Sequence, residues 1–225
     1  MNAERTTRYS SLLPVKKLRT TPVTVIGVGA IGRQVALMLA TMGVEWMILY
    51  DPDTVGLENL GPQGYREEHI TQNKARVTEQ DCRRQNRECL AEARAAKWSP
   101  PPEEEPRQAI FCCVDNIDAR KMIHRQLRQR FLWFGDARMA AESLRVIIDD
   151  HQDPGYYAKT IFPASEAVEL PCTAKATYYC ASIAAGLLVA QYTKWLRGIP
   201  ADPADFVVNL LTMELLDTPL PPRKS

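Results

Sequence analysis

Hydrophobic positions along the chain form short apolar runs that alternate with longer stretches of helical periodicity. Short runs rich in apolar and β-branched residues predict buried strands, and apolar residues that recur every three or four positions predict amphipathic helices. The predicted strands are 23–26, 47–50, 89–93, 109–114, 131–134, 144–148 and 206–211. The predicted helices are 30–42, 73–87, 116–130 and 174–197.

Strands that alternate with helices favour a parallel sheet covered on both faces. The expected fold is therefore α/β, with a Rossmann-like, doubly wound, mainly parallel sheet, an added C-terminal helix and edge strands. Residues 1–21 are expected to form an N-terminal arm, residues 22–215 a single domain, and residues 216–225 a flexible tail. The segment SPPPEEEP at 99–106 predicts a solvated connection, because its prolines exclude a helix or an inner strand.

Composition and charge narrow the classes of function. The chain has 225 residues, of which 45% are hydrophobic, and this is enough for a sizeable core. The formal net charge is only +1, so neither nucleic acid nor a membrane is the expected partner. The polar start shows no signal-peptide pattern, and the six cysteines contain no Cys-x-x-Cys pair. We therefore expect a cytoplasmic protein with free thiols and no structural zinc.

The stretch 23–53 reads as a strand, a Gly-x-Gly-x-x-Gly turn, a helix and a second strand that ends at two carboxylates. Gly27 would allow the tight turn, Gly29 the approach of a phosphate, and Gly32 the close packing of helix on sheet. The helix N-terminus would offer free N–H groups to an anion, and Asp51 would hold ribose hydroxyls. The predicted nucleotide-binding residues of this stretch are Gly27, Gly29, Ala30, Ile31, Gly32 and Asp51.

Further polar side chains follow at the ends of predicted elements. Asp51 and Asp53 come after the second strand, and Asp115 comes after a later one. Because the carboxyl ends of parallel strands face one crevice, these carboxylates can converge although they lie far apart in sequence. The full series in chain order is Asp51, Asp53, Val55, Asn59, Leu60, Gln63, Lys74, Asp115 and Asn116.

This series, together with the glycine turn, resembles the adenylating enzymes of the ThiF, MoeB and HesA family, relatives of the ubiquitin-activating enzymes. Their pattern is a glycine loop, then D-x-D-x-V-x-x-x-N-L-x-R-Q, a lysine, and a D-N pair that ends a strand. The resemblance covers roughly residues 8–200. It implies that the chain binds ATP and Mg²⁺ and activates the C-terminal carboxylate of a ubiquitin-like or sulfur-carrier protein that ends in Gly-Gly. It also implies a homodimer.

The resemblance also assigns roles to individual residues. Asp51 would hold the ribose, while Asn59 and Lys74 would bind the phosphates. Asp115 would bind the magnesium ion, with Asp53 as a candidate second ligand. Lys74 and Asp115 are also candidate catalytic residues, and Gln63 and Asn116 complete the predicted nucleotide site. Each residue has an ordinary structural alternative as well: a turn cap for Asp53 and Asn59, a solvated cation for Lys74, and a helix cap for Asp115.

Cys172 is the candidate nucleophile, in a Pro-Cys-Thr segment that resembles the thioester cysteine of ubiquitin-activating enzymes. Thr173 is a predicted N-cap, which would place the Cys172 thiol beside a helix N-terminus that favours the thiolate. The thiolate would capture an acyl adenylate as a thioester or an acyl persulfide. The alternative is a buried cysteine without a chemical role.

Two arginines of the family pattern are absent, because Ser11 and Pro62 stand in their positions. Losing fixed cations from a phosphoryl-transfer site can cost orders of magnitude in rate. The nearest cations that could replace them are Arg8, Lys16, Lys17, Arg66 and Arg120. The leading hypothesis is therefore an adenylyltransferase, and the first alternative is a non-catalytic, ATP-binding scaffold of the same family. A third, an NAD-dependent oxidoreductase, rests only on the glycine turn and Asp51.

Overall fold

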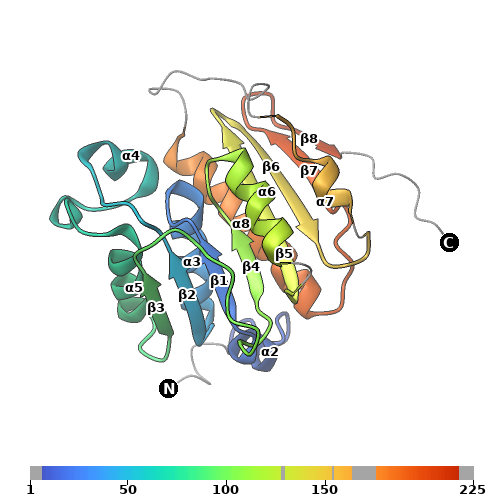
Figure 1. Cartoon of the computed structure of the whole chain (residues 1–225). Helices are drawn as coiled ribbons and strands as arrows, with labels where there is room; N and C mark the ends of the chain where they lie inside the picture. The colour runs from blue at the N-terminus through green and yellow to red at the C-terminus, as the bar shows by residue number, and fades with distance from the viewer. Residues whose placement is uncertain (1–6, 128–129, 154, 164–175, 218–225) are drawn as a thin grey trace.

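A computed structural model of the chain describes residues 7–127, 130–153, 155–163 and 176–217. The strands of the described residues are β1 (Val23–Ile26), β2 (Trp46–Tyr50), β3 (Leu90–Arg94), β4 (Ala109–Cys112), β5 (Trp133–Ala140), β6 (Ser143–Asp149), β7 (Asp205–Asn209) and β8 (Glu214–Asp217). They form one eight-stranded sheet in the order β3-β2-β1-β4-β5-β6-β7-β8 (Figure 1). Strands β3 to β5 of this order run parallel, and β6 to β8 continue it antiparallel. The predicted fold class is confirmed.

Helices cover both faces of this sheet. They are α2 (Val15–Thr20), α3 (Ala30–Met42), α4 (Leu60–Gln63), α5 (Lys74–Gln85), α6 (Ile117–Leu127), α7 (Tyr156–Lys159) and α8 (Tyr178–Leu196), with short 3-10 turns η1 (Leu57–Asn59) and η2 (Glu67–His69). In Figure 1, α6 and α7 lie in front of the sheet, and α3 and α8 lie behind it. None of the helices in the described ranges is long and apolar enough to cross a membrane.

The two faces bury separate cores because side chains alternate along each strand. On β1, Val25 packs with α3 and α8, whereas Ile26 packs with the aromatic cluster under α6 and α7. On β4, Phe111 and Cys112 divide between the two cores in the same way. The central strands are therefore buried on both sides, as expected for a doubly wound sheet.

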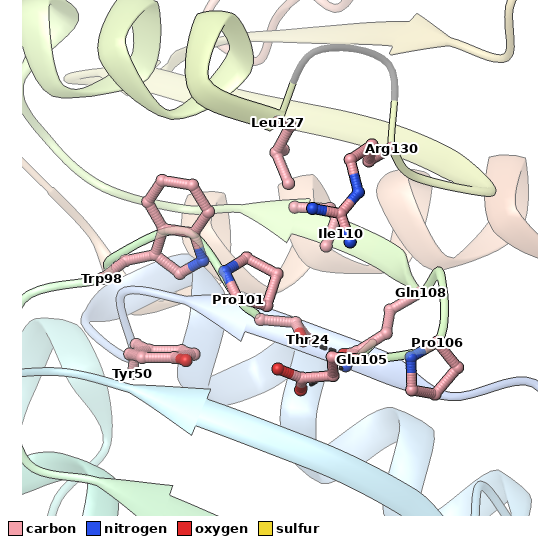
Figure 2. Close-up of a pocket in the computed structure, with 10 residues that line it drawn as sticks. All are labelled: Thr24, Tyr50, Trp98, Pro101, Glu105, Pro106, Gln108, Ile110, Leu127 and Arg130. Carbon is pink, nitrogen blue, oxygen red and sulfur yellow. Dashed lines mark hydrogen bonds between the residues drawn. The ribbon is translucent and has the colours of Figure 1, made fainter. Parts of the chain in front are cut away.

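The connection from β3 to β4 contains neither helix nor strand, in agreement with the sequence, but it is more than a solvated link. Trp98 is only 8% exposed and packs with Tyr50 and Ile110. This loop covers a part of the sheet face that a crossover helix would otherwise cover. A hollow of about 20 Å³ remains between Trp98, Leu127 and Arg130 (Figure 2), which is room for one water molecule.

The predicted strand 131–134 is too short, because β5 runs on to Ala140 and forms an antiparallel hairpin with β6. Ala141, with φ of 54°, makes the turn. The charged residues Asp136 and Arg138 make the sequence of this strand resemble that of a loop. In the structure, however, Asp136 is fully buried, and its Oδ2 lies 2.9 Å from Nε of Arg138. Their other partners, Arg120, Tyr157 and Thr160, lie on other elements, so the local pattern could not reveal them.

The last helix also differs from its prediction. It begins at Tyr178 instead of 174, and Thr177 caps it by accepting a hydrogen bond from the N–H of Cys180. The predicted cap Thr173 and its neighbour Cys172 lie outside the described residues. Strand β8 is not among the predicted strands, because Leu215 and Leu216 are both exposed and show no alternation. It crosses the expected boundary of the tail, and the domain assignment stays a prediction.

Gly32→Ala should be strongly destabilising, because an added Cβ would lie 1.8 Å from the carbonyl oxygen of Gly27. We expect the free energy of unfolding, measured by urea denaturation, to fall by about 2–4 kcal/mol. The control is Gly61→Ala, because nothing lies within 4 Å of a Cβ at that position. It should change stability by less than about 0.5 kcal/mol. Equal effects of the two substitutions would show that helix α3 can move away from the turn.

Candidate functional site

The candidate site lies where the carboxyl ends of β1, β2 and β4 meet. Ile26 at the end of β1 is in register with Tyr50 of β2 and Cys112 of β4. Beyond the strands, Gly27 N donates to Tyr50 O at 2.8 Å, and Cys113 N donates to Ile26 O at 2.8 Å. The strand order reverses between β1 and β4, and in such sheets ligands bind in the crevice at this reversal.

The glycine turn has the geometry that its spacing predicts. Gly27 has φ of 84°, and an added Cβ would lie 3.0 Å from Cys113 O, so only glycine fits. Gly29 is the N-cap of α3 and no side chain caps the helix. The first N–H groups of α3, including those of Ala30 and Ile31, have no carbonyl one turn earlier in the helix. This end of α3 can therefore bind an anion.

Asp51 fixes the turn through its carboxylate. Its Oδ2 accepts the N–H of Val28 at 2.8 Å, and its Oδ1 accepts the N–H of Asp53 at 2.9 Å. Burial raises the pKa of the Asp51 carboxyl, and these two hydrogen bonds oppose the rise. The peptide after the first glycine is thus tied to the end of β2. The N–H of Val28 is already occupied and is not among the donors free for a ligand.

Lys74 is brought to this place by the start of α5. Its backbone N–H donates to Asp53 O at 2.9 Å, and its Nζ lies 3.3 Å from Asp53 Oδ2. Asn73 caps the helix and also donates through Nδ2 to the carbonyls of Asp51 and Asp53, at 3.0 and 2.9 Å. The Lys74 side chain is 9% exposed. The structure therefore brings Asp51, Asp53 and Lys74 together beside the glycine turn.

Asn59 and Gln63 lie on η1 and α4, in the segment after β2 that approaches the glycine turn at Gly29. Asn59 ends η1 and accepts the N–H of Gly56 through Oδ1 at 2.9 Å. Gln63 ends α4, and its Oε1 lies 3.9 Å from the place of a Cβ on Gly29. This oxygen is buried and has no hydrogen-bond partner within the part of the chain that the structure describes. It is an unused acceptor that faces the start of α3.

Asp115 and Asn116 follow β4 on the other side of the turn. Asn116 caps α6, because its Oδ1 accepts the N–H of Ala119 at 2.9 Å. The capping role considered for Asp115 thus belongs to Asn116, and the Asp115 carboxylate is exposed at the rim. Within the described ranges, no group of three His, Cys, Asp or Glu residues could hold a metal ion. Mg²⁺ bound with ATP needs only one or two carboxylates, so Asp115 fits that demand.

Two of the cations considered as replacements for the missing arginines form ion pairs with carboxylates outside the glycine turn. Arg66 lies 3.2 Å from Asp81 and 2.9 Å from Glu68. Arg120 is buried and paired with Asp136. Both guanidinium groups are therefore held by carboxylates of the fold.

The N-terminal arm supplies the other candidate cations. Tyr9 donates to Met42 O at 3.0 Å at the end of α3, and Lys17 Nζ donates to Leu196 O at 3.1 Å at the end of α8. These helix ends lie at the amino edge of the sheet, opposite to the glycine turn (Figure 1). Lys17 and helix α2 thus lie at the edge of the sheet away from the glycine turn of their own chain.

Tyr65 is a site residue that the sequence analysis missed. Its hydroxyl donates to Val28 O at 2.7 Å, so the backbone N–H and the carbonyl of Val28 are both hydrogen-bonded. Burial raises the Tyr65 pKa, which keeps the hydroxyl protonated, and its ring lies 4.3 Å from Cζ of the buried Arg33. A lone tyrosine after the end of α4, far along the chain from the glycine turn, carries no diagnostic pattern in a single sequence, so only the structure could find it.

Comparison with known proteins gives a consistent set of similarities. The ThiF family model matches residues 6–224. The chain is 27% identical over 124 residues to ubiquitin-like modifier-activating enzyme 5 of Mus musculus, which covers 48% of this chain and 31% of that protein. The Xenopus laevis enzyme of the same name is 28% identical over 141 residues, covering 52% and 35%. The matched region thus spans about a third of these relatives.

Solved structures show the same fold. The crystal structure of PaaA has a TM-score of 0.76 at 19% identity, covering 97% of this chain and 74% of PaaA. E. coli MccB with MccA-N7isoASN has a TM-score of 0.77 at 17% identity, covering 99% and 74%. E. coli MccB with ATP has a TM-score of 0.71 at 17% identity, covering 95% and 71%.

Asp51→Asn tests whether the carboxylate holds the glycine turn. An amide keeps one acceptor oxygen, so one buried N–H loses its partner and stability should fall by about 1–3 kcal/mol. Because burial raises the Asp51 pKa above its ordinary value of 3.8, ionisation costs the native state free energy. The free energy of unfolding of the wild type should therefore fall as the pH rises from 3.8, the ordinary pKa of the carboxyl, through its raised pKa in the folded protein. Asp51→Asn has no carboxyl at this position and should lack this fall.

The gap in unfolding free energy between wild type and Asp51→Asn should thus narrow as the pH rises. Urea denaturation at a series of pH values measures it, with the exposed Asp118→Asn as control. A gap that widens with pH would contradict the direction of the Asp51 pKa shift.

Proposed function

Because the chain belongs to the ThiF family, we propose that it is an ATP-dependent adenylyltransferase that activates a carboxylate. One observation carries this proposal: the uncapped start of α3, the Asp51 carboxylate and the Lys74 ammonium share one place at the carboxyl ends of the strands. That combination offers donors for phosphates and an acceptor for a ribose. The likeness to the fold of MccB solved with ATP supports the choice of nucleotide.

In the proposed complex, the N–H groups at the start of α3 bind phosphate oxygens, and Asp51 accepts from the ribose. Lys74, now paired with Asp53 at 3.3 Å, would turn its ammonium to the phosphates. Gln63 would use its free Oε1 as an acceptor for the nucleotide. Asp115, with Asp53 as candidate second ligand, would hold a magnesium ion, which supplies neutralisation of the triphosphate charge.

The proposed reaction is a displacement at the α-phosphorus of ATP. An oxygen of the substrate carboxylate forms a bond to this phosphorus while the bond to the pyrophosphate oxygen breaks. The electron pair leaves with pyrophosphate, and the product is an acyl adenylate. The protein's contribution is to position the two reactants and to neutralise the charge on the phosphates.

We also propose that the substrate is the C-terminal carboxylate of a ubiquitin-like or sulfur-carrier protein that ends in Gly-Gly. Relatives named for activation of a ubiquitin-like modifier, and the MccB structures that include MccA, support a protein or peptide substrate. Capture of the adenylate by Cys172 belongs to this proposal: the thiolate forms a bond to the acyl carbon, AMP leaves with the electron pair of the broken acyl–oxygen bond, and a thioester results. The acyl persulfide would form in the same way, with AMP as leaving group, if Cys172 first carried a persulfide supplied by a sulfur donor.

A homodimer is part of the same proposal. Tyr179, Ile183 and Ala190 recur at helical spacing on the outer face of α8, and all three are exposed. Gly186 lies on the same face, with nothing within 4 Å of a Cβ there. Such a face suits close packing against the same helix of a second copy. Light scattering would distinguish a dimer from a monomer of 25.4 kDa.

A second candidate function is a non-catalytic, ATP-binding scaffold that docks the same kind of partner. Ser11 and Pro62 in the two arginine positions favour it, and so does the pairing of Arg66 and Arg120 with carboxylates of the fold. Membership of the ThiF family argues against an NAD-dependent oxidoreductase. Titration with ATP and with NAD should therefore show a clear preference for ATP.

Asp115→Asn tests the adenylation site. With a Gly-Gly carrier protein present, the rate of ATP–pyrophosphate exchange should fall by about 100-fold or more, because the ligand for Mg²⁺ is lost. The carboxylate is exposed, so stability should hardly change. Asp118→Asn, also exposed and three positions further along at the start of α6, is the matched control and should keep full exchange. A wild type that binds ATP but shows no exchange with any carrier would favour the scaffold instead.

Cys172→Ala tests covalent capture. We expect pyrophosphate exchange to persist and the covalent carrier adduct, detected by mass spectrometry, to disappear. The control variant is Cys180→Ala, which should keep the adduct. Burial raises the pKa of the Cys180 thiol to about 11, so little thiolate is present at neutral pH. An adduct that survives in Cys172→Ala would exclude Cys172 as the nucleophile.

A further inference from the structure

A cluster of charged side chains lies buried where β4 ends beside the middle of β5. Its centre is Asp136, which is completely buried in β5. Asp136 Oδ2 accepts the hydroxyl of Tyr157 at 2.8 Å and Nε of Arg138 at 2.9 Å, and its Oδ1 pairs with Arg120 of α6. We call these four residues the β4–β5 cluster.

Arg120 does more than neutralise Asp136. Its Nη1 donates to Cys112 O at 3.4 Å, and its Nη2 donates to Ala137 O at 3.1 Å and also to Val114 O. One guanidinium thus ties the end of β4 to β5. Arginine can do this because its donors are fixed in a planar fork, whereas lysine presents its donors from a single point.

The backbone that Arg120 holds is the backbone against which the glycine turn packs. A Cβ on Gly27 would lie 3.0 Å from Cys113 O and 3.1 Å from Val114 N. The next residue along the chain is Asp115. Arg120 thus binds the carbonyls on either side of the Cys113–Val114 peptide, which packs against Gly27. One of these carbonyls, Val114 O, belongs to the residue just before Asp115, the candidate metal ligand.

We propose that Arg120 is a positioning residue of the adenylation site, which holds the end of β4 so that the glycine turn and Asp115 keep their mutual arrangement. This inference rests on the proposed function. Arg120 is 5% exposed and acts through backbone carbonyls, without contact to the nucleotide. The cluster thus places a charge-assisted network directly below the strand ends that the nucleotide would span.

The chain contains a matched control for this cluster. Asp205 of β7 is also completely buried, accepts the hydroxyl of Tyr156 at 2.7 Å, and pairs with Arg145 of β6 at 2.6 Å. This second group has the same three kinds of side chain. It lies between antiparallel strands, beyond β5 from the glycine turn. Its loss should lower stability without touching the site.

The experiment compares Arg120→Lys with Arg145→Lys in the full chain. Thermal unfolding measures stability, calorimetry measures the dissociation constant for MgATP, and amide hydrogen exchange follows residues 26–32 and 112–116. Both variants should be less stable than the wild type. Only Arg120→Lys should raise the dissociation constant by about tenfold and speed exchange in these two segments.

Equal changes in both variants, or unchanged exchange at 112–116 in Arg120→Lys, would overturn the inference. If Arg120→Lys fails to fold, the pair Asp136→Asn and Asp205→Asn allows the same comparison, since each weakens one cluster while keeping the shape of its side chain. A wild type that binds no ATP would refute the proposed function. The exchange measurement would still decide whether Arg120 holds the glycine turn.

Discussion

The candidate site depends on one carboxylate. Asp51 accepts the N–H groups of Val28 and Asp53, and this ties the glycine turn after β1 to the end of β2. The same segment carries Asp53, which pairs with Lys74 at the start of α5. A turn, two strands and a helix thus form one frame. The two N–H donors offset part of the cost of burying the carboxylate, because buried polar groups are tolerated when they are hydrogen-bonded.

Much of this frame could be predicted from sequence because its signals are local. The glycines, the apolar periodicity of α3 and the position of Asp51 lie within one strand–helix–strand unit, and strand direction then places Asp115 at the same edge. The β5–β6 hairpin could not be predicted in the same way. Asp136 and Arg138 resemble loop residues until the distant Arg120 and Tyr157 are seen beside them. Tyr65 has no local signature for the same reason.

Several arginines near the candidate site form ion pairs with carboxylates of the fold. Arg33 lies 2.7 Å from Asp81, Arg66 shares that carboxylate, and Arg120 pairs with Asp136. Buried guanidinium groups need such partners, since an unpaired buried charge is strongly destabilising. Arg33 and Arg120 are buried, so their positive charge is used within the fold, whereas the Arg66 side chain is 48% exposed. The roles assigned to Lys74 and Asp115 stay predictions, and Cys172 lies outside the described residues.

The occupied amide of Val28 has a consequence for ligand recognition. Its N–H donates to Asp51, so Val28 has no backbone donor left for a ligand, and its carbonyl accepts from Tyr65. Among the described residues, an anion that arrives at the turn meets the uncapped N–H groups at the start of α3 and the nearby Lys74 ammonium. Backbone recognition there is consequently a property of the helix terminus. The glycine turn itself is held by hydrogen bonds from Asp51 and Tyr65, and it sets the direction of the α3 N-terminus.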